Sequence, residues 1–128
     1  MGSFLRSRGR SFRYAYAGWR YVLRTQPNAW IHAFATLAVG LAGWWLDLSG
    51  LEWAVIVLVI ALVWSTEFIN TALEAVVDLA SPQQHPLARV AKDVGAAAVL
   101  LASFGSVVIG LLILGPPLWA RIQVLWTP

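Results

Sequence analysis

The sequence has 128 residues, of which 59% are hydrophobic and 12% are charged, and it has no cysteine. So high a hydrophobic share excludes an ordinary soluble domain, and the length predicts a single domain. The missing cysteines exclude a disulfide framework and a thiolate metal site. The formal net charge is +3, and most of the basic residues lie near the N-terminus: Arg6, Arg8, Arg10, Arg13, Arg20 and Arg24.

The basic N-terminal segment predicts a helix on the membrane surface. Residues 1–10 are rich in Gly, Ser and Arg and are expected to be mobile, and an amphipathic helix is expected over 11–25 with Ser11 as its cap. Its arginines and its apolar side chains lie about 100° apart on a helical wheel. Such a helix lies on anionic headgroups, so we favour a membrane contact over a nucleic-acid partner. The residue before Pro27 avoids helical geometry, so Gln26 should end the helix.

Three apolar segments predict transmembrane helices, over 28–46, 51–79 and 86–114. Each reaches the roughly 20 residues that a bilayer crossing needs. His32, near the start of the first, is expected to form hydrogen bonds at the interface rather than to bind a metal. Gly115-Pro116-Pro117 should end the third helix, and residues 119–128 form a short tail. The membrane-embedded domain therefore covers 11–118.

The basic residues near the segment ends predict the orientation. Arg89 and Lys92 flank the second connection, and the first connection has no basic residue. Because basic residues concentrate on the cytoplasmic side, the N-terminus and residues 80–92 should be cytoplasmic.

Small residues form a ridge at helical spacing along the third segment, and such a ridge is a close-packing face for membrane helices. Its members are Ala91, Gly95, Ala98, Ala102, Ser106 and Gly110. We expect this face to contribute to packing between subunits.

A polar stripe on the second segment is the feature around which the chain is organised. It consists of Glu67, Asn70, Thr71, Glu74 and Asp78, which fall within about 100° on a helical wheel. Carboxylates at membrane depth are costly and mark function by default. The alternative is an interhelical hydrogen-bond stripe, for which a single buried Asn would suffice.

These residue types suit phosphoryl transfer to a lipid. Glu74 and Asp78 can reach Mg²⁺, which needs only one or two carboxylates together with phosphate oxygens. Lys92 can neutralise a phosphate as a point charge. Glu67, which lies deeper, can act as a general base on a lipid hydroxyl. The sequence has no P-loop and no protein-kinase signature, so a phosphate site must be built from side chains of several helices.

Two motifs carry a resemblance to a known family: EFINTALEAVVD over 67–78 and HPLARVAKDVGAAAV over 85–99. Together they resemble the prokaryotic diacylglycerol kinase family, which includes undecaprenol kinases, and the resemblance covers residues 11–115. It implies an all-α membrane enzyme with a surface helix and three transmembrane helices in the bacterial plasma membrane. It also implies a homotrimer with shared active sites, ATP as co-substrate and Mg²⁺ as cofactor.

The resemblance also implies roles for individual residues. Glu67 would be the catalytic base, Asn70 would support the site, and Glu74 would ligate Mg²⁺ near the ATP phosphates. The nucleotide would be contacted by Lys92, Asp93, Gln83, Gln84, His85 and either Tyr14 or Tyr16. The family commonly has a second metal-binding glutamate where this sequence has Gln26, whose amide oxygen can bind a metal but brings no charge.

Two other function classes fit an acidic membrane helix. One is a proton- or ion-translocating subunit in which Glu67 or Glu74 would be the relay, and the other is a structural membrane protein. A cation beside a metal-binding acid, as in Lys92-Asp93, has no obvious use in a proton relay and favours the kinase. The sequence leaves open whether the lipid is diacylglycerol or undecaprenol.

Overall fold

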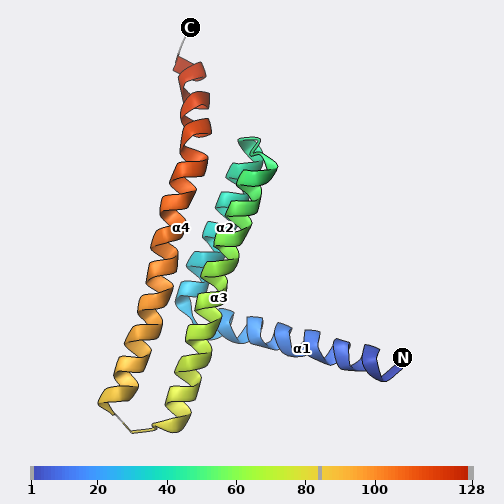
Figure 1. Ribbon diagram of the computed structural model, residues 1–128, viewed down its shortest axis with the longest axis vertical. Coiled ribbons are helices and arrows are strands. Elements are labelled where there is room, and N and C mark those ends of the chain that lie inside the picture. Colours follow the sequence, from blue (N-terminus) through green and yellow to red (C-terminus); the bar gives the residue numbers. More distant parts are fainter. Residues whose placement is uncertain (1, 84, 127–128) are drawn as a thin grey trace.

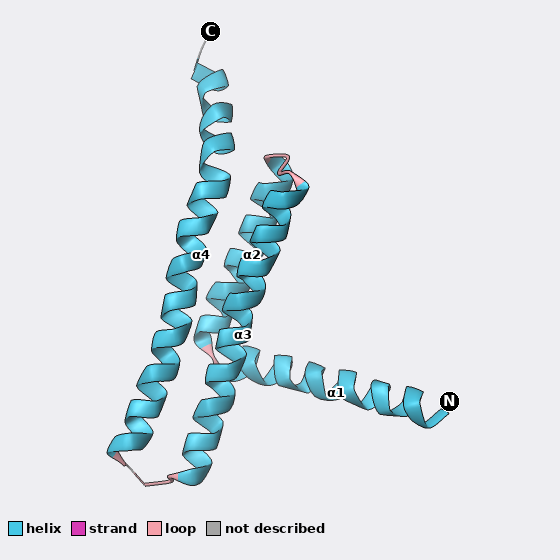
Figure 2. Cartoon of the chain, viewed as in Figure 1, coloured by secondary structure: helices cyan, strands magenta, loops and turns pink. Residues whose placement is uncertain are grey.

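The computed structural model describes residues 2–83 and 85–126, and this part of the chain is helical apart from short connections (Figures 1 and 2). The helices are α1 (Gly2–Thr25), α2 (Pro27–Trp45), α3 (Gly50–Ala80) and α4 (Pro86–Trp126). Helices α2, α3 and α4 run alongside one another, and α1 projects sideways from them (Figure 1). The prediction of an all-α fold is confirmed.

Helices α3 and α4 are long and apolar enough to cross a membrane, over Gly50–Ala80 and Pro86–Leu125. Large apolar side chains such as Phe104 and Leu112 are exposed on them, as expected for a surface that faces lipid. Helix α2, at 19 residues, matches the segment predicted as the first span but is not among these two. The third crossing therefore stays a prediction.

Two helix ends differ from the sequence-based prediction. Helix α1 begins at Gly2 rather than at Ser11, because residues 2–10 contain no proline and include Leu and Arg, which favour helix. Helix α4 continues through Pro116 and Pro117 to Trp126, so the prediction that these prolines end it is wrong.

Beyond the prolines, α4 is held against the turn that joins α2 to α3. Arg121 Nη2 lies 2.7 Å from Asp47 Oδ2, and the guanidinium lies 5.3 Å from the centre of the Trp45 ring. These contacts help to stabilise a helical continuation that the prolines alone would oppose. Asp47 itself adopts a φ of 56°, a left-handed conformation that Asp tolerates in turns.

Short-range chemistry fixes the starts of α2 and α3. Gln26 is extended, with Pro27 in the first turn of α2, as the sequence predicted. Ser49 and Glu52 form a capping box that starts α3. The spacing S-x-x-E is the known signature of this motif, so the start of α3 at Gly50 could have been predicted.

Helix α4 packs along α3 through part of the ridge of small residues. Gly95 lies against Asn70 and Leu73 of α3, while Ala102, Ser106 and Gly110 are partly covered and Ala98 is exposed. The ridge thus brings the backbones of α3 and α4 together within one chain. Its expected part in packing between subunits stays a prediction.

Candidate active site

The polar stripe of α3 is buried at its N-terminal end. Glu67 is 2% exposed, and Asn70 and Thr71 are buried as well. Thr71 donates its hydroxyl to the carbonyl oxygen of Glu67, at 2.9 Å, so its polar group is satisfied within the helix. Glu74 is partly covered, and Asp78, at the end of α3, is exposed. The stripe therefore runs from an accessible end to a shielded carboxylate.

A cleft of about 400 Å³ opens over this stripe. Its polar lining consists of Gln26, Asn28, His32, Glu67, Asn70, Glu74 and Ser103, and its apolar lining includes Val99 and Leu100 of α4. The cleft thus gathers side chains from the α1–α2 junction, α2, α3 and α4. Of the residues predicted for the chemical step and the metal, Gln26, Glu67, Asn70 and Glu74 line it, whereas Asp78 lines a different cleft.

Two amides hold the Glu74 carboxylate. Gln26 Nε2 donates to Oε2 at 2.9 Å, and Asn70 Nδ2 donates to Oε1 at 3.2 Å. Gln26 is 48 positions away in the sequence, so this bond ties the start of α2 to α3. Hydrogen bonds to an ionised acceptor are stronger than neutral ones, and these two fix the carboxylate at the mouth of the cleft.

Asn70 reaches a second helix through its amide oxygen. Oδ1 is buried and has no hydrogen-bond partner in the described part of the chain, and it lies directly over Gly95 of α4. A Cβ atom at position 95 would collide with Oδ1. Only glycine leaves room there for the amide that orients Glu74.

Gly95→Ala is therefore expected to displace Asn70 and, through it, Glu74. We expect it to lower the free energy of unfolding by about 1–3 kcal/mol, the usual range for overpacking, and to reduce activity as well. Thermal unfolding in detergent and a kinase assay would measure the two effects. Gly105→Ala is the matched control, since nothing lies within 4 Å of its added Cβ. Equal behaviour of the two variants would contradict this role of Gly95.

A second cleft, of about 650 Å³, lies at the end of the helix pair, where α3 turns into α4. It is lined by Asp78, Gln83, His85, Arg89, Lys92 and Asp93, among others. Lys92 Nζ lies 2.6 Å from Asp78 Oδ1, and Arg89 Nε lies 3.9 Å from Asp93 Oδ2. The structure therefore gathers four of the residues predicted to contact a nucleotide, next to a cluster of charges.

Three other residues predicted to contact the nucleotide are not placed in this cleft. Gln84 lies outside the described residues. Tyr14 and Tyr16 are exposed on α1 and line neither cleft. Helix α1 projects sideways from the other helices (Figure 1), and neither tyrosine is among the described residues that line the cleft at the α3–α4 end.

An aromatic cluster beside Glu67 could not be assembled from the sequence. Trp19 of α1 lies 4.7 Å, ring centre to ring centre, from both Trp64 and Phe68 of α3. On a helical wheel, Trp19 belongs to the apolar face of the predicted surface helix. Trp19 packs on α3 beside the polar stripe. The cluster fixes the C-terminal part of α1 against α3, beside Glu67.

The structure places His32 in surroundings that the sequence did not predict. The sequence predicted hydrogen bonds at the membrane interface, whereas His32 lines the same cleft as Glu67, and its Nε2 lies 3.7 Å from Glu67 Oε2. The local sequence around His32 does not show this, because the contact depends on how α2 crosses α3.

Comparison with known proteins identifies the family. Residues 13–114 match the family described as prokaryotic diacylglycerol kinase. The chain belongs to this family. The resemblance carried by the motifs of α3 and α4 is thus confirmed, and the family favours a lipid kinase over an ion-translocating subunit.

Members of the diacylglycerol kinase family with assigned names are similar over most of this chain. A "Diacylglycerol kinase" of Synechocystis sp. is 49% identical over 84% of the chain, which spans 62% of that protein. An "Undecaprenol kinase" of Bacillus subtilis is 43% identical over 85% of the chain and 89% of its own length. A "Diacylglycerol kinase" of Escherichia coli is 36% identical over 62% of the chain and 71% of its length. These names confirm the prediction of a lipid kinase family. They include both diacylglycerol and undecaprenol, the two lipids between which the sequence did not decide.

The cleft residues suit the metal and nucleotide that a kinase of this family implies. In the described part of the chain, no three Asp, Glu or His side chains lie close enough to hold a metal ion by themselves. Glu74 nevertheless supplies one carboxylate to the cleft. One or two carboxylates suffice for Mg²⁺ when phosphate oxygens complete its coordination. The donor set therefore fits an ion that arrives together with a nucleotide.

Proposed function

We propose that this protein transfers the γ-phosphoryl group of ATP to the primary hydroxyl of a membrane lipid at the cytoplasmic membrane face. The observation that carries the proposal is the position of Glu67. It is a shielded carboxylate on a helix apolar enough to cross a membrane, and it opens into the same cleft as Glu74. A lipid hydroxyl can reach such a group from the bilayer, while phosphates approach from the other end.

Glu67 would act as the general base of the reaction. In this step the carboxylate accepts the proton of the lipid hydroxyl, the lipid oxygen forms a bond to the γ-phosphorus, and the bond from that phosphorus to the bridging oxygen breaks, so that ADP leaves. The apolar walls of the cleft, including Val99 and Leu100, exclude water that would otherwise compete for the phosphoryl group. Asn70 orients Glu74 through the 3.2 Å hydrogen bond. It would therefore affect the end of the cleft at which the phosphates of ATP are proposed to bind.

Glu74 would hold a divalent cation, which we expect to be Mg²⁺, with Gln26 as a neutral neighbour. The ion would neutralise charge on the phosphate groups when bound. The amide of Gln26 already contacts Glu74 Oε2 at 2.9 Å. Its own oxygen could be turned to the ion by rotation of the amide, although it would add no negative charge.

The cleft at the α3–α4 connection would hold the nucleotide. Lys92 is paired with Asp78 at 2.6 Å, and an anionic phosphate is a competing partner for the same ammonium group. Asp93, Gln83 and His85 line this cleft as well. Asp78 keeps Lys92 at the cleft, and we expect the lysine to turn to a phosphate when nucleotide binds.

The membrane arrangement is part of this proposal. We infer that α2 is a third crossing beside α3 and α4, that the N-terminus is cytoplasmic, and that the protein lies in the bacterial plasma membrane. We also propose a homotrimer, as the resemblance implies. The cleft over Glu67 is walled by only three helices of one chain, and a neighbouring subunit could complete its cover. Tyr14 or Tyr16 on the projecting α1 would then reach a neighbour's nucleotide.

The proposed activity predicts ATP-dependent phosphorylation of a lipid in mixed micelles. Purified protein is incubated with labelled ATP, Mg²⁺ and either diacylglycerol or undecaprenol, and the labelled lipid is extracted and counted. We expect transfer to at least one of these primary alcohols, and the ratio of kcat/KM between them assigns the lipid. ATP hydrolysis without a labelled lipid, or no turnover with either substrate, would contradict the proposal. A matched reaction with Lys92→Gln should show a raised KM for ATP.

A further inference from the structure

His32 and Glu67 face each other inside the active-site cleft. The imidazole Nε2 of His32 lies 3.7 Å from Glu67 Oε2, and the two side chains are only 12% and 3% exposed. Within the described residues, Nε2 has no hydrogen-bond partner. A buried nitrogen without a partner is unfavourable, and the distance exceeds a usual hydrogen bond by less than 1 Å. The pair is thus close to a hydrogen bond that the structure does not yet form.

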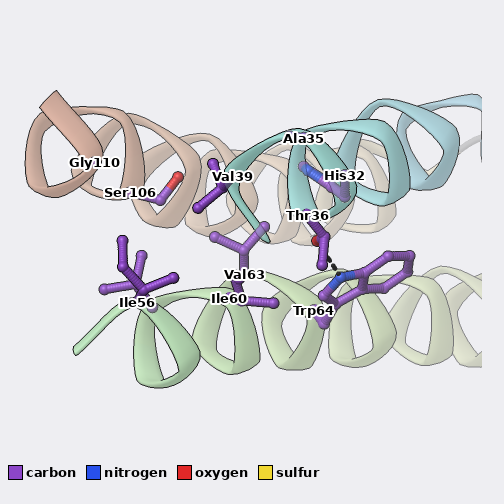
Figure 3. Close-up of a pocket in the computed structure, with 11 residues that line it drawn as sticks. His32, Ala35, Thr36, Val39, Ile56, Ile60, Val63, Trp64, Ser106 and Gly110 are labelled. Carbon is purple, nitrogen blue, oxygen red and sulfur yellow. Dashed lines mark hydrogen bonds between the residues drawn. The ribbon is translucent and has the colours of Figure 1, made fainter. Parts of the chain in front are cut away.

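Contacts with α3 and within α2 restrict where the His32 ring can move. Trp64 packs edge-on against it, with 6.1 Å between ring centres. The Trp64 indole donates its Nε1–H to Thr36, one helical turn beyond His32, at 3.1 Å. Figure 3 shows His32 and Thr36 on α2 above Trp64 on α3, with this hydrogen bond dashed. These contacts fix α2 against α3 at the level of Glu67, and closing the 3.7 Å gap to hydrogen-bond length needs a movement of less than 1 Å.

Among the described residues that line the cleft, His32 is the one cationic or imidazole side chain available to Glu67. Of the other side chains that line the cleft, only Glu74 is titratable, and its oxygens accept from Gln26 and Asn70. The part of α4 that lines the cleft contributes Ala96, Val99, Leu100 and Ser103, none of which carries charge. His32 is therefore the described cleft residue best placed to orient Glu67.

We propose that His32 is a positioning residue for Glu67. With substrate in the cleft, Nε2–H donates a hydrogen bond to Oε2, and the other carboxylate oxygen, Oε1, receives the proton of the lipid hydroxyl. In that step the lipid O–H bond breaks, a bond forms between the lipid oxygen and the γ-phosphorus, and the bond from that phosphorus to the nucleoside diphosphate breaks. Catalytic hydrogen bonds are often long before substrate binds, in agreement with the 3.7 Å separation. The inference rests on the proposed kinase function.

Steady-state kinetics of His32 variants test this role. His32→Phe keeps an aromatic ring against Trp64 but removes both nitrogens, and His32→Gln keeps a donor. We expect His32→Phe to lower kcat roughly 10- to 100-fold, by analogy with residues that orient a metal ligand, with KM for ATP and lipid nearly unchanged. His32→Gln should recover part of the lost kcat. A raised KM with an unchanged kcat in His32→Phe would overturn the proposal, and so would a kcat of His32→Gln no higher than that of His32→Phe.

Thr36→Val is the matched control for helix packing. It removes the hydrogen bond from Trp64 on the same helix but leaves the imidazole in place. We expect kcat to change much less than in His32→Phe. If both variants lose activity equally, His32 acts through the packing of α2 on α3, and the proposal is wrong.

A double variant tests whether His32 acts through Glu67. In a Glu67→Gln background there is no carboxylate to orient, so His32→Phe should reduce the residual rate little further. Independent sites would instead give multiplied losses, and that result would contradict the proposal.

Spectroscopy separates this inference from the kinase function itself. The chain has two histidines, so His85→Gln assigns the ¹³Cε1 NMR signal of His32 in detergent. We expect Glu67→Gln to shift that signal, whatever the substrate of the protein is. An unchanged signal would overturn the pairing of His32 with Glu67. Failure of wild-type protein to phosphorylate either lipid would overturn the function while leaving this measurement intact.

Discussion

Glu67→Gln is expected to lower kcat for lipid phosphorylation by about 10²–10⁴-fold, the usual effect of losing a positioned general base. Glutamine has nearly the same shape and can still fill the 2%-exposed site, but its amide cannot accept the hydroxyl proton in the same way. The variant should therefore fold and bind both substrates, with the loss confined to the chemical step.

The measurement is kcat with saturating ATP and lipid, together with thermal unfolding of the same samples. Glu52→Gln is the matched control, since Glu52 is a carboxylate of the same helix that serves the capping box at its opposite end. That variant should lose some stability and keep its kcat. Near-normal turnover of Glu67→Gln would show that another group takes the proton.

Glu74→Ala is expected to weaken the binding of Mg²⁺ and ATP together and to reduce kcat/KM for ATP by about 10²-fold, which corresponds to about 2.7 kcal/mol. The carboxylate receives hydrogen bonds from Gln26 at 2.9 Å and from Asn70 at 3.2 Å. Removing it takes away the charge proposed to hold the ion and leaves two amides without their acceptor. Both effects fall at the phosphate end of the cleft.

The rate measured against Mg²⁺ at fixed ATP, and against ATP at fixed Mg²⁺, resolves this effect. Glu74→Asp should retain part of the metal response, because a carboxylate remains. Asp47→Asn serves as control, as its carboxylate lies at the other end of the bundle against Arg121, and its Mg²⁺ response should match that of the wild type. If Glu74→Ala keeps the wild-type Mg²⁺ dependence, Glu74 is structural and the ion binds elsewhere.

The helical content and the polar stripe could be predicted from the sequence because both depend on local periodicity. A stretch as apolar as the one before Glu67 has few alternatives to a helix in a membrane, and the spacing of Glu67, Asn70 and Glu74 places them on one face of any helix. Pro27 marked the boundary between α1 and α2 for an equally local reason. The family could also be identified from contiguous motifs.

Helix ends were predicted less well where a distant contact decides them. The prolines at 116 and 117 oppose a helix locally, but α4 continues, with Arg121 reaching Asp47 across 74 positions of sequence. Such a contact depends on the place of the α2–α3 turn beside α4, and no local pattern encodes that place.

The chemical environment of the site was decided by tertiary structure. By itself the sequence determined which face of α3 is polar, but only the packing of α2 and α4 decided what that face meets. The fit of Gly95 under Asn70 requires close approach of α3 and α4, and the 3.7 Å approach of His32 to Glu67 requires the crossing of α2 over α3. Side chains from different helices become neighbours only when the helices pack, so periodicity within one helix determines a stripe and packing between helices determines a site.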